Sequence, residues 1–242
     1  MTAAAGDAAP VIAFRPVAGA EPALARLPAA ERALLPPAAT ARRRLEFAAG
    51  RAAARAAVGR LLRDPGACAA VLRDASAGTA QPVALDARGA RLPAYVSITH
   101  TEGVAAAAAF GAPVGVDLVR VEALDGAFHR EAFWPEELRA FERALGEPRA
   151  GFAACAAFGA KEAVVKWLGT GLTVPLRAVR LSLGPPAPPE RLGGLRARRF
   201  ALALEGPVRA ALRAWIGAAG PYLLVAVTAD APAEPADPLR SA

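Results

Sequence analysis

A long and mostly apolar helix is the sequence feature that most constrains the fold. The sequence predicts this helix over residues 149–168, and Gly169 ends it. Its apolar side chains must pack against other elements, so its charged side chains must lie at the margin of a buried surface. Those charges are Lys161, Glu162 and Lys166. The two lysines are the only ones in the chain, because every other basic residue is an arginine.

The spacing of these charges allows two interpretations. Glu162 and Lys166 are four residues apart and share a helix face, where a surface ion pair is worth about 0.2–0.5 kcal/mol. The alternative starts from Asp117, the only acidic residue on a predicted strand over 114–121, beside Gly115, which would let a ligand approach the backbone. An aspartate on a strand and a glutamate on a neighbouring helix form an oxygen site that suits Mg²⁺. With lysines beside it, such a site suits phosphoryl transfer.

The remaining elements indicate an α+β protein with strands and helices in each half. The first half is predicted to hold a weak helix over 21–35, a helix over 41–62 capped by Thr40, and strands over 11–17, 81–85, 95–99 and 104–110. The second half is predicted to hold one or two helices over 128–145 and strands over 114–121, 178–183, 200–204 and 222–228. The proline-rich run 184–189 is predicted to be a loop, and the tail from Asp230 to be disordered.

Composition limits the class of protein. The 55% hydrophobic content is mostly alanine, and the longest apolar run, 104–116, is interrupted by Gly111 and Pro113 and is too short to span a bilayer. The N-terminus lacks the pattern of a signal peptide. Cys68 and Cys155 cannot by themselves form a disulfide framework or a zinc site. We therefore expect a soluble, cytoplasmic protein.

The net charge of +7 favours acidic partners without selecting one. Arg44, Arg51 and Arg55 share one face of the predicted helix over 41–62, which is either a phosphate-binding stripe or an ordinary exposed face. A basic nucleic-acid-binding protein is the alternative class. The 6% aromatic content argues against it, because single strands are bound by aromatic side chains interleaved with cations.

Two motifs together resemble a known family. GVD at 115–117 and FGAKEAVVK at 158–166 are similar, in sequence and in separation, to the signature pair of the 4′-phosphopantetheinyl transferases. VSITHT at 96–101 and RRRLEFAAGRAAAR at 42–55 resemble motifs of the longer, surfactin-type branch. The resemblance covers roughly residues 30–230.

The resemblance implies a fold and an activity. The fold would be an α+β pseudo-dimer of two similar subdomains, each a small antiparallel sheet packed with helices. Residues 1–111 would form the subdomain on the side of the coenzyme A 3′-phosphate, 112–229 the subdomain with the metal and catalytic motifs, and 230–242 a disordered tail. The enzyme would use Mg²⁺ to move phosphopantetheine from coenzyme A to a serine of an acyl or peptidyl carrier protein. It would release adenosine 3′,5′-bisphosphate and act as a monomer, with fatty acid, polyketide or nonribosomal peptide pathways all possible.

The resemblance also implies roles for individual residues. Asp117 and Glu162 would bind the metal, Glu162 would take the serine proton directly or through water, and Lys166 would stabilise the developing charge or protonate the leaving group. Lys161 would contact phosphate. The 3′-phosphate would be bound by His100 with Arg51 or Arg55, and the nucleotide would be reached by Arg88 or Arg91. His129 is interpreted as a surface residue on a helix.

One position departs from the long branch. Long members carry a second acidic residue two places after the aspartate, where this chain has Val119. GVDLVRVE and LGTGL at 168–172 instead resemble the short, trimeric holo-acyl-carrier synthases, which hold the metal with one Asp and one Glu. Water is expected to take the third ligand place in preference to Glu122 or Glu102. A degenerate member that binds coenzyme A or a carrier without turnover is a further alternative.

Overall fold

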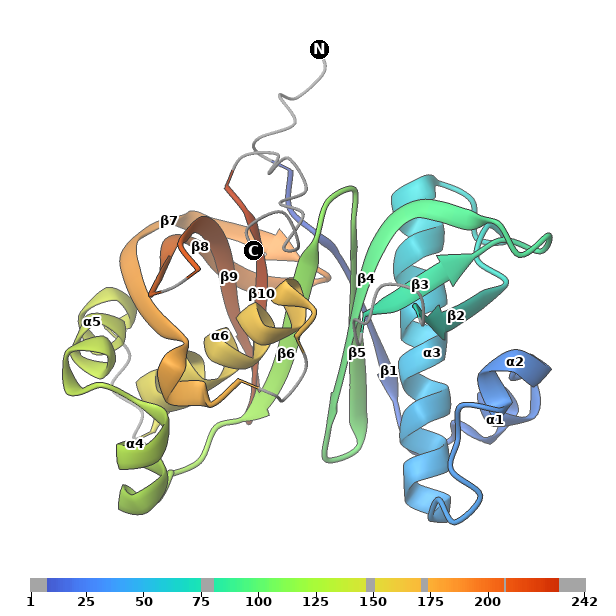
Figure 1. Ribbon diagram of the computed structural model, residues 1–242, viewed down its shortest axis with the longest axis horizontal. Helices are drawn as coiled ribbons and strands as arrows, with labels where there is room; N and C mark the ends of the chain where they lie inside the picture. Colours follow the sequence, from blue (N-terminus) through green and yellow to red (C-terminus); the bar gives the residue numbers. More distant parts are fainter. Residues whose placement is uncertain (1–7, 75–80, 147–150, 171–173, 207, 231–242) are drawn as a thin grey trace, which may run out of the picture.

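Two five-stranded antiparallel sheets face each other at the centre of the molecule, and helices cover the outer side of each (Figure 1). The structure is a computed structural model that describes residues 8–74, 81–146, 151–170, 174–206 and 208–230. This architecture confirms the predicted α+β class. The expected beginning of the central helix at 149 and most of the expected tail lie outside the described residues.

Both sheets follow one connectivity. The first subdomain contains β1 (Val11–Pro16), α1 (Glu21–Ala25), α2 (Ala29–Arg32), α3 (Ala41–Leu62), β2 (Ala70–Arg73), β3 (Pro82–Leu85), β4 (Arg91–Thr101) and β5 (Val104–Phe110). The second contains β6 (Val114–Arg120), α4 (Gly126–Ala132), α5 (Pro135–Leu145), α6 (Phe152–Leu168), η2 (Leu176–Ala178), β7 (Arg180–Leu192), β8 (Leu195–Glu205), β9 (Ala210–Ala219) and β10 (Tyr222–Ala229). The strand orders are β1-β5-β4-β3-β2 and β6-β10-β9-β8-β7. Each subdomain is thus a strand, a set of helices and four further strands, as a pseudo-dimer requires.

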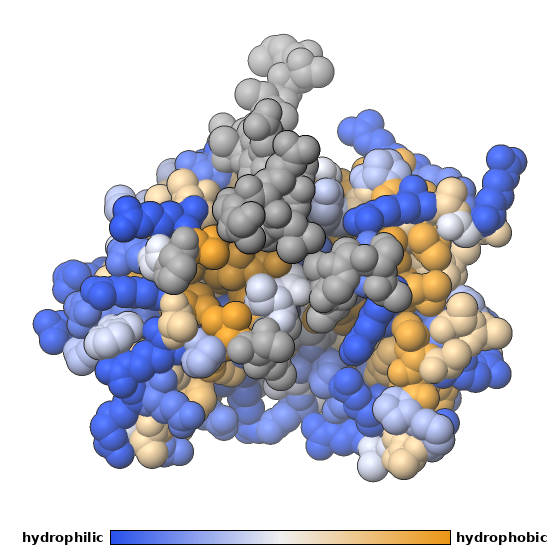
Figure 2. All heavy atoms as spheres, in the orientation of Figure 1, coloured by the Kyte–Doolittle hydropathy of each residue, from blue (hydrophilic) through white to orange (hydrophobic). Residues whose placement is uncertain are grey.

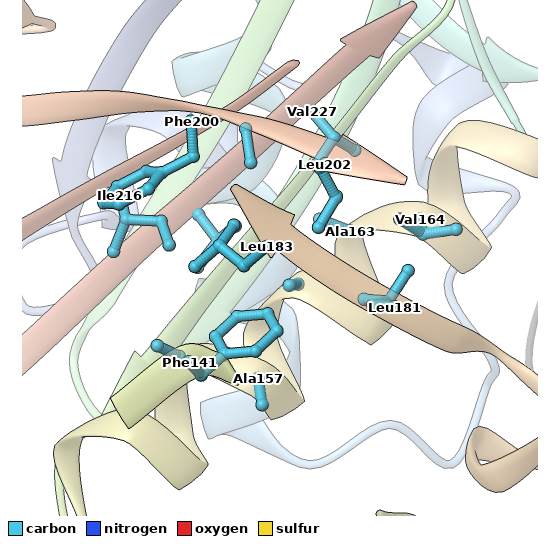
Figure 3. Close-up of a cluster of buried hydrophobic side chains, with 14 of the residues drawn as sticks. Phe141, Ala157, Ala163, Val164, Leu181, Leu183, Phe200, Leu202, Ile216 and Val227 are labelled. Carbon is cyan, nitrogen blue, oxygen red and sulfur yellow. The ribbon is translucent and has the colours of Figure 1, made fainter. Parts of the chain in front are cut away.

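Apolar side chains fill three layers between these elements. Ile12, Val116 and Trp215 belong to the cluster between the two sheets. Alanines of α3 and β5 dominate the layer under α3. Larger side chains lie under α5 and α6, where Phe141 and Phe200 are buried (Figure 3). Hydrophilic side chains spread over the periphery of both subdomains (Figure 2).

The close packing of α6 on β6 explains the glycine before Asp117. A Cβ atom at Gly115 would lie 1.8 Å from the Ala163 carbonyl oxygen. Gly115 therefore serves the approach of the helix, and the structure replaces the expectation that it admits a ligand to the backbone. The helix then ends as predicted, at Gly169 in the left-handed conformation with φ 73°.

Three expectations about elements were wrong. The proline-rich run 184–189 lies within β7, where register shifts between Leu183 and Pro189 accommodate the missing amide donors. Strands β2 and β9 were not predicted. The formation of β9 depends on the sheet it joins, because half of its residues are alanines, which carry little strand propensity. Asp230 is also ordered, since its backbone N–H donates to the Ala211 carbonyl.

Candidate active site

Asp117 lies on β6 with its side chain turned toward α6. The carboxylate is nearly buried, at 7% exposed, and its Oδ1 lies 2.6 Å from Lys166 Nζ. The ammonium group also donates to the Val116 carbonyl, at 3.0 Å. Two of the residues that the sequence placed in one site are therefore in direct contact, across the interface of a strand and a helix.

Thr99 on β4 supports this aspartate from the other subdomain. Its hydroxyl donates to Asp117 Oδ1 at 2.9 Å and accepts from the Leu118 backbone N–H at 3.3 Å. Ser97, two residues earlier on the same face of β4, accepts from the Val116 N–H at 3.1 Å. Because β6 is an edge strand, these hydroxyls satisfy backbone donors that no neighbouring strand reaches.

Glu162 lies one helical turn before Lys166 on α6 and is half-buried. Its burial raises the pKa of the carboxyl above the usual range, and repulsion by Asp117 raises it further, while Lys166 lowers it. The two carboxyl groups are thus close enough to interact. A carboxylate held in this state accepts either a cation or a proton readily, as a metal ligand or a general base must.

At position 119, where the long branch carries a second acidic residue, this chain has a valine that packs against α6. Val119 faces α6 on the same side of β6 as Asp117 and is 8% exposed. A Cβ atom at Gly159 would lie 3.1 Å from Val119 Cγ2, so the valine occupies the space beside that glycine. Glu102 and Glu122 are both exposed, and Glu102 is paired with Arg120. Neither carboxylate replaces the missing one in this structure.

The side chain of Lys161 points into the core, away from the carboxyl group of Glu162. Its side chain is fully buried, with Nζ 2.9 Å from Glu137 Oε2. The ammonium also donates to the carbonyls of Val179, at 2.6 Å, and Leu176, at 3.0 Å. Five residues along a helix turn the side chain by about 140°, which separates it from Lys166. The buried side chain of Lys161 is therefore not accessible to a phosphate group.

A second polar group lies at the end of β4. His100 Nε2 is 2.6 Å from Arg43 Nη1, and His100 Nδ1 is 3.8 Å from Glu46 Oε2. Burial lowers the pKa of His100 most, and Arg43, Lys166 and Arg42 lower it further, whereas Glu46 raises it. This group adjoins the one around Asp117, because Thr99, the residue before His100 on β4, donates to Asp117.

Arg43 is a site residue that the sequence analysis missed, because the predicted stripe ran through Arg44. The side of α3 that faces β4 is marked by Gly50, where a Cβ atom would lie 2.9 Å from Ile98 Cγ2. Arg43 is seven residues earlier and so lies on that same side. Arg44 instead donates to the carbonyls of Pro37 and Ala39.

The other candidate arginines have different surroundings. Arg51 is 7% exposed, stacks on Phe47 with 4.6 Å from the guanidinium carbon to the ring centroid, and has no hydrogen-bond partner for its Nε among the described residues. Burial lowers its pKa to about 10, so it remains a cation at neutral pH. Arg55 is engaged by buried Glu31, at 2.6 Å. Arg91 pairs with Asp74, at 3.2 Å.

Three hollows on the described surface lie away from Asp117, Glu162 and Lys166, and the largest of these three is lined in part by Arg55. They have volumes of 650, 470 and 320 Å³, and none of the three is lined by Asp117, Glu162 or Lys166. The smallest is lined in part by His129, a half-buried residue of α4 whose ring meets Phe133 edge to face. Arg88 lies exposed just before β4.

The comparisons agree with the geometry of the second subdomain. Residues 113–209 match the family model of the 4′-phosphopantetheinyl transferase superfamily. The matched segment holds Asp117, Glu162 and Lys166, and the match does not distinguish the surfactin-type branch. No curated protein matched the chain. In the described part of the chain, no helix is long and apolar enough to cross a membrane.

The donor set around Asp117 fits Mg²⁺. Magnesium is held by one or two carboxylates and completes its octahedron with water and phosphate oxygens, and Asp117 and Glu162 supply two carboxylates. Among the described residues, no group of three or more His, Cys, Asp or Glu side chains is arranged to hold a metal ion. An all-protein cage is therefore not offered, and the site would depend on substrate oxygens.

Proposed function

We propose that this protein transfers the 4′-phosphopantetheine group from coenzyme A to a serine of an apo carrier protein. The observation that carries the proposal is the contact of Lys166 with Asp117 beside Glu162, inside the segment that matches the superfamily. The reaction forms a bond between the serine oxygen and the β-phosphorus of coenzyme A. It breaks the bond from that phosphorus to the bridging oxygen, and adenosine 3′,5′-bisphosphate leaves.

Each residue has a stated part in this chemistry. Glu162 accepts the serine proton directly or through water, and Lys166 donates to the bridging oxygen as negative charge develops there. Asp117 and Glu162 would hold Mg²⁺, which supplies charge neutralisation at the pyrophosphate when bound. Thr99 keeps Asp117 oriented toward α6.

A group of basic side chains would receive the nucleotide end of coenzyme A. His100 at the end of β4 contacts Arg43 of α3, and Arg51 offers a buried guanidinium whose Nε has no partner among the described residues. Phosphate is a suitable partner for such groups because it accepts several charge-assisted hydrogen bonds. Arg55 and Arg91 would have to leave Glu31 and Asp74 to take part, so we assign the phosphate to His100, Arg43 and Arg51.

The test is a transfer assay on a panel of apo carrier proteins. Purified protein, coenzyme A and Mg²⁺ are incubated with acyl, polyketide and peptidyl carriers, and the intact masses of the carriers are measured. The expected result is an added phosphopantetheine mass on at least one carrier, lost when its serine is replaced by alanine. No mass shift on any carrier would exclude the proposal.

Val119 favours one second candidate, a coenzyme A-binding member without turnover. A packed valine leaves two carboxylates where long relatives have three, which weakens the metal site. Isothermal titration of coenzyme A separates the candidates. Binding without transfer to any carrier would support the inactive member.

A further inference from the structure

Glu46 on α3 is a nearly buried carboxylate surrounded by cationic groups. It is 9% exposed, which is unusual for a glutamate unless it is paired. Arg42 Nε donates to its Oε1 at 2.8 Å, Arg43 Nη1 lies 4.0 Å from its Oε2, and His100 Nδ1 lies 3.8 Å from the same oxygen. Glu46 therefore links the first two turns of α3 to the end of β4.

The contact between Arg43 and His100 assigns the proton on the imidazole. A guanidinium has only donors and stays charged, so His100 Nε2, at 2.6 Å from Arg43 Nη1, must accept. A neutral imidazole that accepts at Nε2 carries its proton on Nδ1. That nitrogen faces the Glu46 carboxylate at 3.8 Å, too far for a hydrogen bond but within reach of a charge–dipole attraction.

We propose that Glu46 is a positioning residue that holds His100 as the Nδ1–H tautomer, and that binding of a phosphate group at Arg43 and His100 is coupled to uptake of one proton at Nε2. A phosphate oxygen competes with Nε2 for the Arg43 donor and is repelled by the nitrogen lone pair. A proton taken from solvent converts Nε2 into a donor to the phosphate. The resulting imidazolium lies between two negative charges, with Glu46 at Nδ1 and phosphate at Nε2.

The surrounding charges determine the direction of the effect. Arg42 and Arg43 on α3 and Lys166 on α6 disfavour the imidazolium, and Glu46 favours it. In the free protein the cations and burial prevail, so the pKa of His100 is lowered and the ring is neutral at neutral pH. Phosphate reverses this balance because it neutralises Arg43 and approaches Nε2 directly.

The chain contains two histidines, which makes the test direct. Long-range ¹H–¹⁵N spectra of the imidazoles report the tautomer and protonation of each ring, with His129 as an internal reference. Spectra are recorded with and without inorganic phosphate or adenosine 3′,5′-bisphosphate. We expect His100 in the Nδ1–H form at about pH 8, and a rise of its pKa by about one unit with either anion. His129 should not change. An Nε2–H tautomer, or no change at His100 with both anions, would overturn the inference.

The variant Glu46→Gln tests the role of the carboxylate, and Glu131→Gln on α4 is the matched control. We expect the anion-induced rise at His100 to fall by at least half in Glu46→Gln and to stay unchanged in Glu131→Gln. An unchanged tautomer and rise in Glu46→Gln would overturn the positioning role. A second measurement needs no variant. Calorimetric titration of the wild-type protein with adenosine 3′,5′-bisphosphate, in buffers of different ionisation enthalpy, should show proton uptake, and zero uptake would contradict the coupling.

This inference rests on the proposed function only for the identity of the anion. The measurements need no carrier protein, Mg²⁺ or turnover. A protein that shows the His100 response but transfers nothing would retain the inference and lose the proposed function. A protein that transfers but shows no response at His100 would do the reverse.

Discussion

Thr99 donates a 2.9 Å hydrogen bond to Asp117, from a strand of one subdomain to a strand of the other. The next residue of β4, His100, points to the opposite face and meets Arg43 on α3. One strand thus presents consecutive side chains to two adjacent polar groups. The alternation of β4 explains why a motif of the first subdomain bears on the proposed chemistry of the second.

The variant Thr99→Val should weaken the metal site without unfolding the protein. A hydrogen bond to a charged group contributes about 1.5–3 kcal/mol, so loss of the hydroxyl leaves both Asp117 and the Leu118 N–H short of a partner. We expect about a tenfold higher Mg²⁺ concentration for half-maximal transfer. Thr99→Ser keeps the hydroxyl and is the control, expected to stay within about twofold of wild type. Equal Mg²⁺ dependence of all three proteins would remove Thr99 from the site.

Lys166→Ala should lower kcat more than it raises the KM for the carrier. The ammonium contacts Asp117 beside Glu162, so we expect it to act on the reacting groups and not on the carrier surface. A group that stabilises developing charge contributes about 10²–10³-fold to kcat. Steady-state kinetics with a fluorescent coenzyme A derivative measure both constants. A change confined to the KM for the carrier would contradict this assignment.

Glu162→Gln should abolish transfer while leaving the fold intact. Removal of a general base costs about 10²–10⁴-fold, and this variant also loses a metal ligand. Glu142→Gln, on α5, is the control and should keep full activity. Activity of Glu162→Gln within tenfold of wild type would show that the proton leaves by another route.

The same variant should be more stable than wild type at alkaline pH in metal-free buffer. Burial and Asp117 raise the pKa of Glu162 in the folded state, so the folded protein binds its proton more tightly than the unfolded chain does. Stability from this group is therefore present below its unfolded pKa and is lost as pH rises through the folded one. We expect Tm to increase by about 1–3 °C near pH 8, a small effect because water screens the half-exposed carboxylate, and no increase near pH 4. Thermal melts at both pH values measure the difference, and an equal shift at both would exclude the charge as its cause.

The sequence was sufficient where local pattern decides structure. Gly169 ends α6 because the residue must be left-handed, and the four-residue spacing of Glu162 and Lys166 places both on the side that faces β6. Local sequence pattern did not predict the environment of a side chain whose partners come from distant segments. Lys161 has the same chemistry as Lys166, and only the arrival of Glu137 from α5 shows it to be a core residue.

The arginines show the same limit. Helical periodicity places Arg51 and Arg55 near one another on α3, but it does not reveal that Glu31 from α2 engages one of them. Nor does it show which side of α3 faces β4. The close contact at Gly50 gives that information, and it favours Arg43 over Arg44.

Lys161→Met should destabilise the protein strongly without a specific effect on coenzyme A. The substitution leaves the buried Glu137 carboxyl without its ammonium partner, and among the described residues the backbone N–H groups of Leu181 and Trp134 remain as its donors. Loss of one partner of a buried ion pair costs about 3–5 kcal/mol. The matched control is Arg180→Gln, which removes the exposed pairs of Arg180 with Glu136 and Glu205 and should cost less than about 1 kcal/mol. Urea unfolding measures both losses. If Lys161 instead contacts phosphate, Lys161→Met will lose no more unfolding free energy than the control and will raise the KM for coenzyme A. That result would contradict the structural role that its burial predicts.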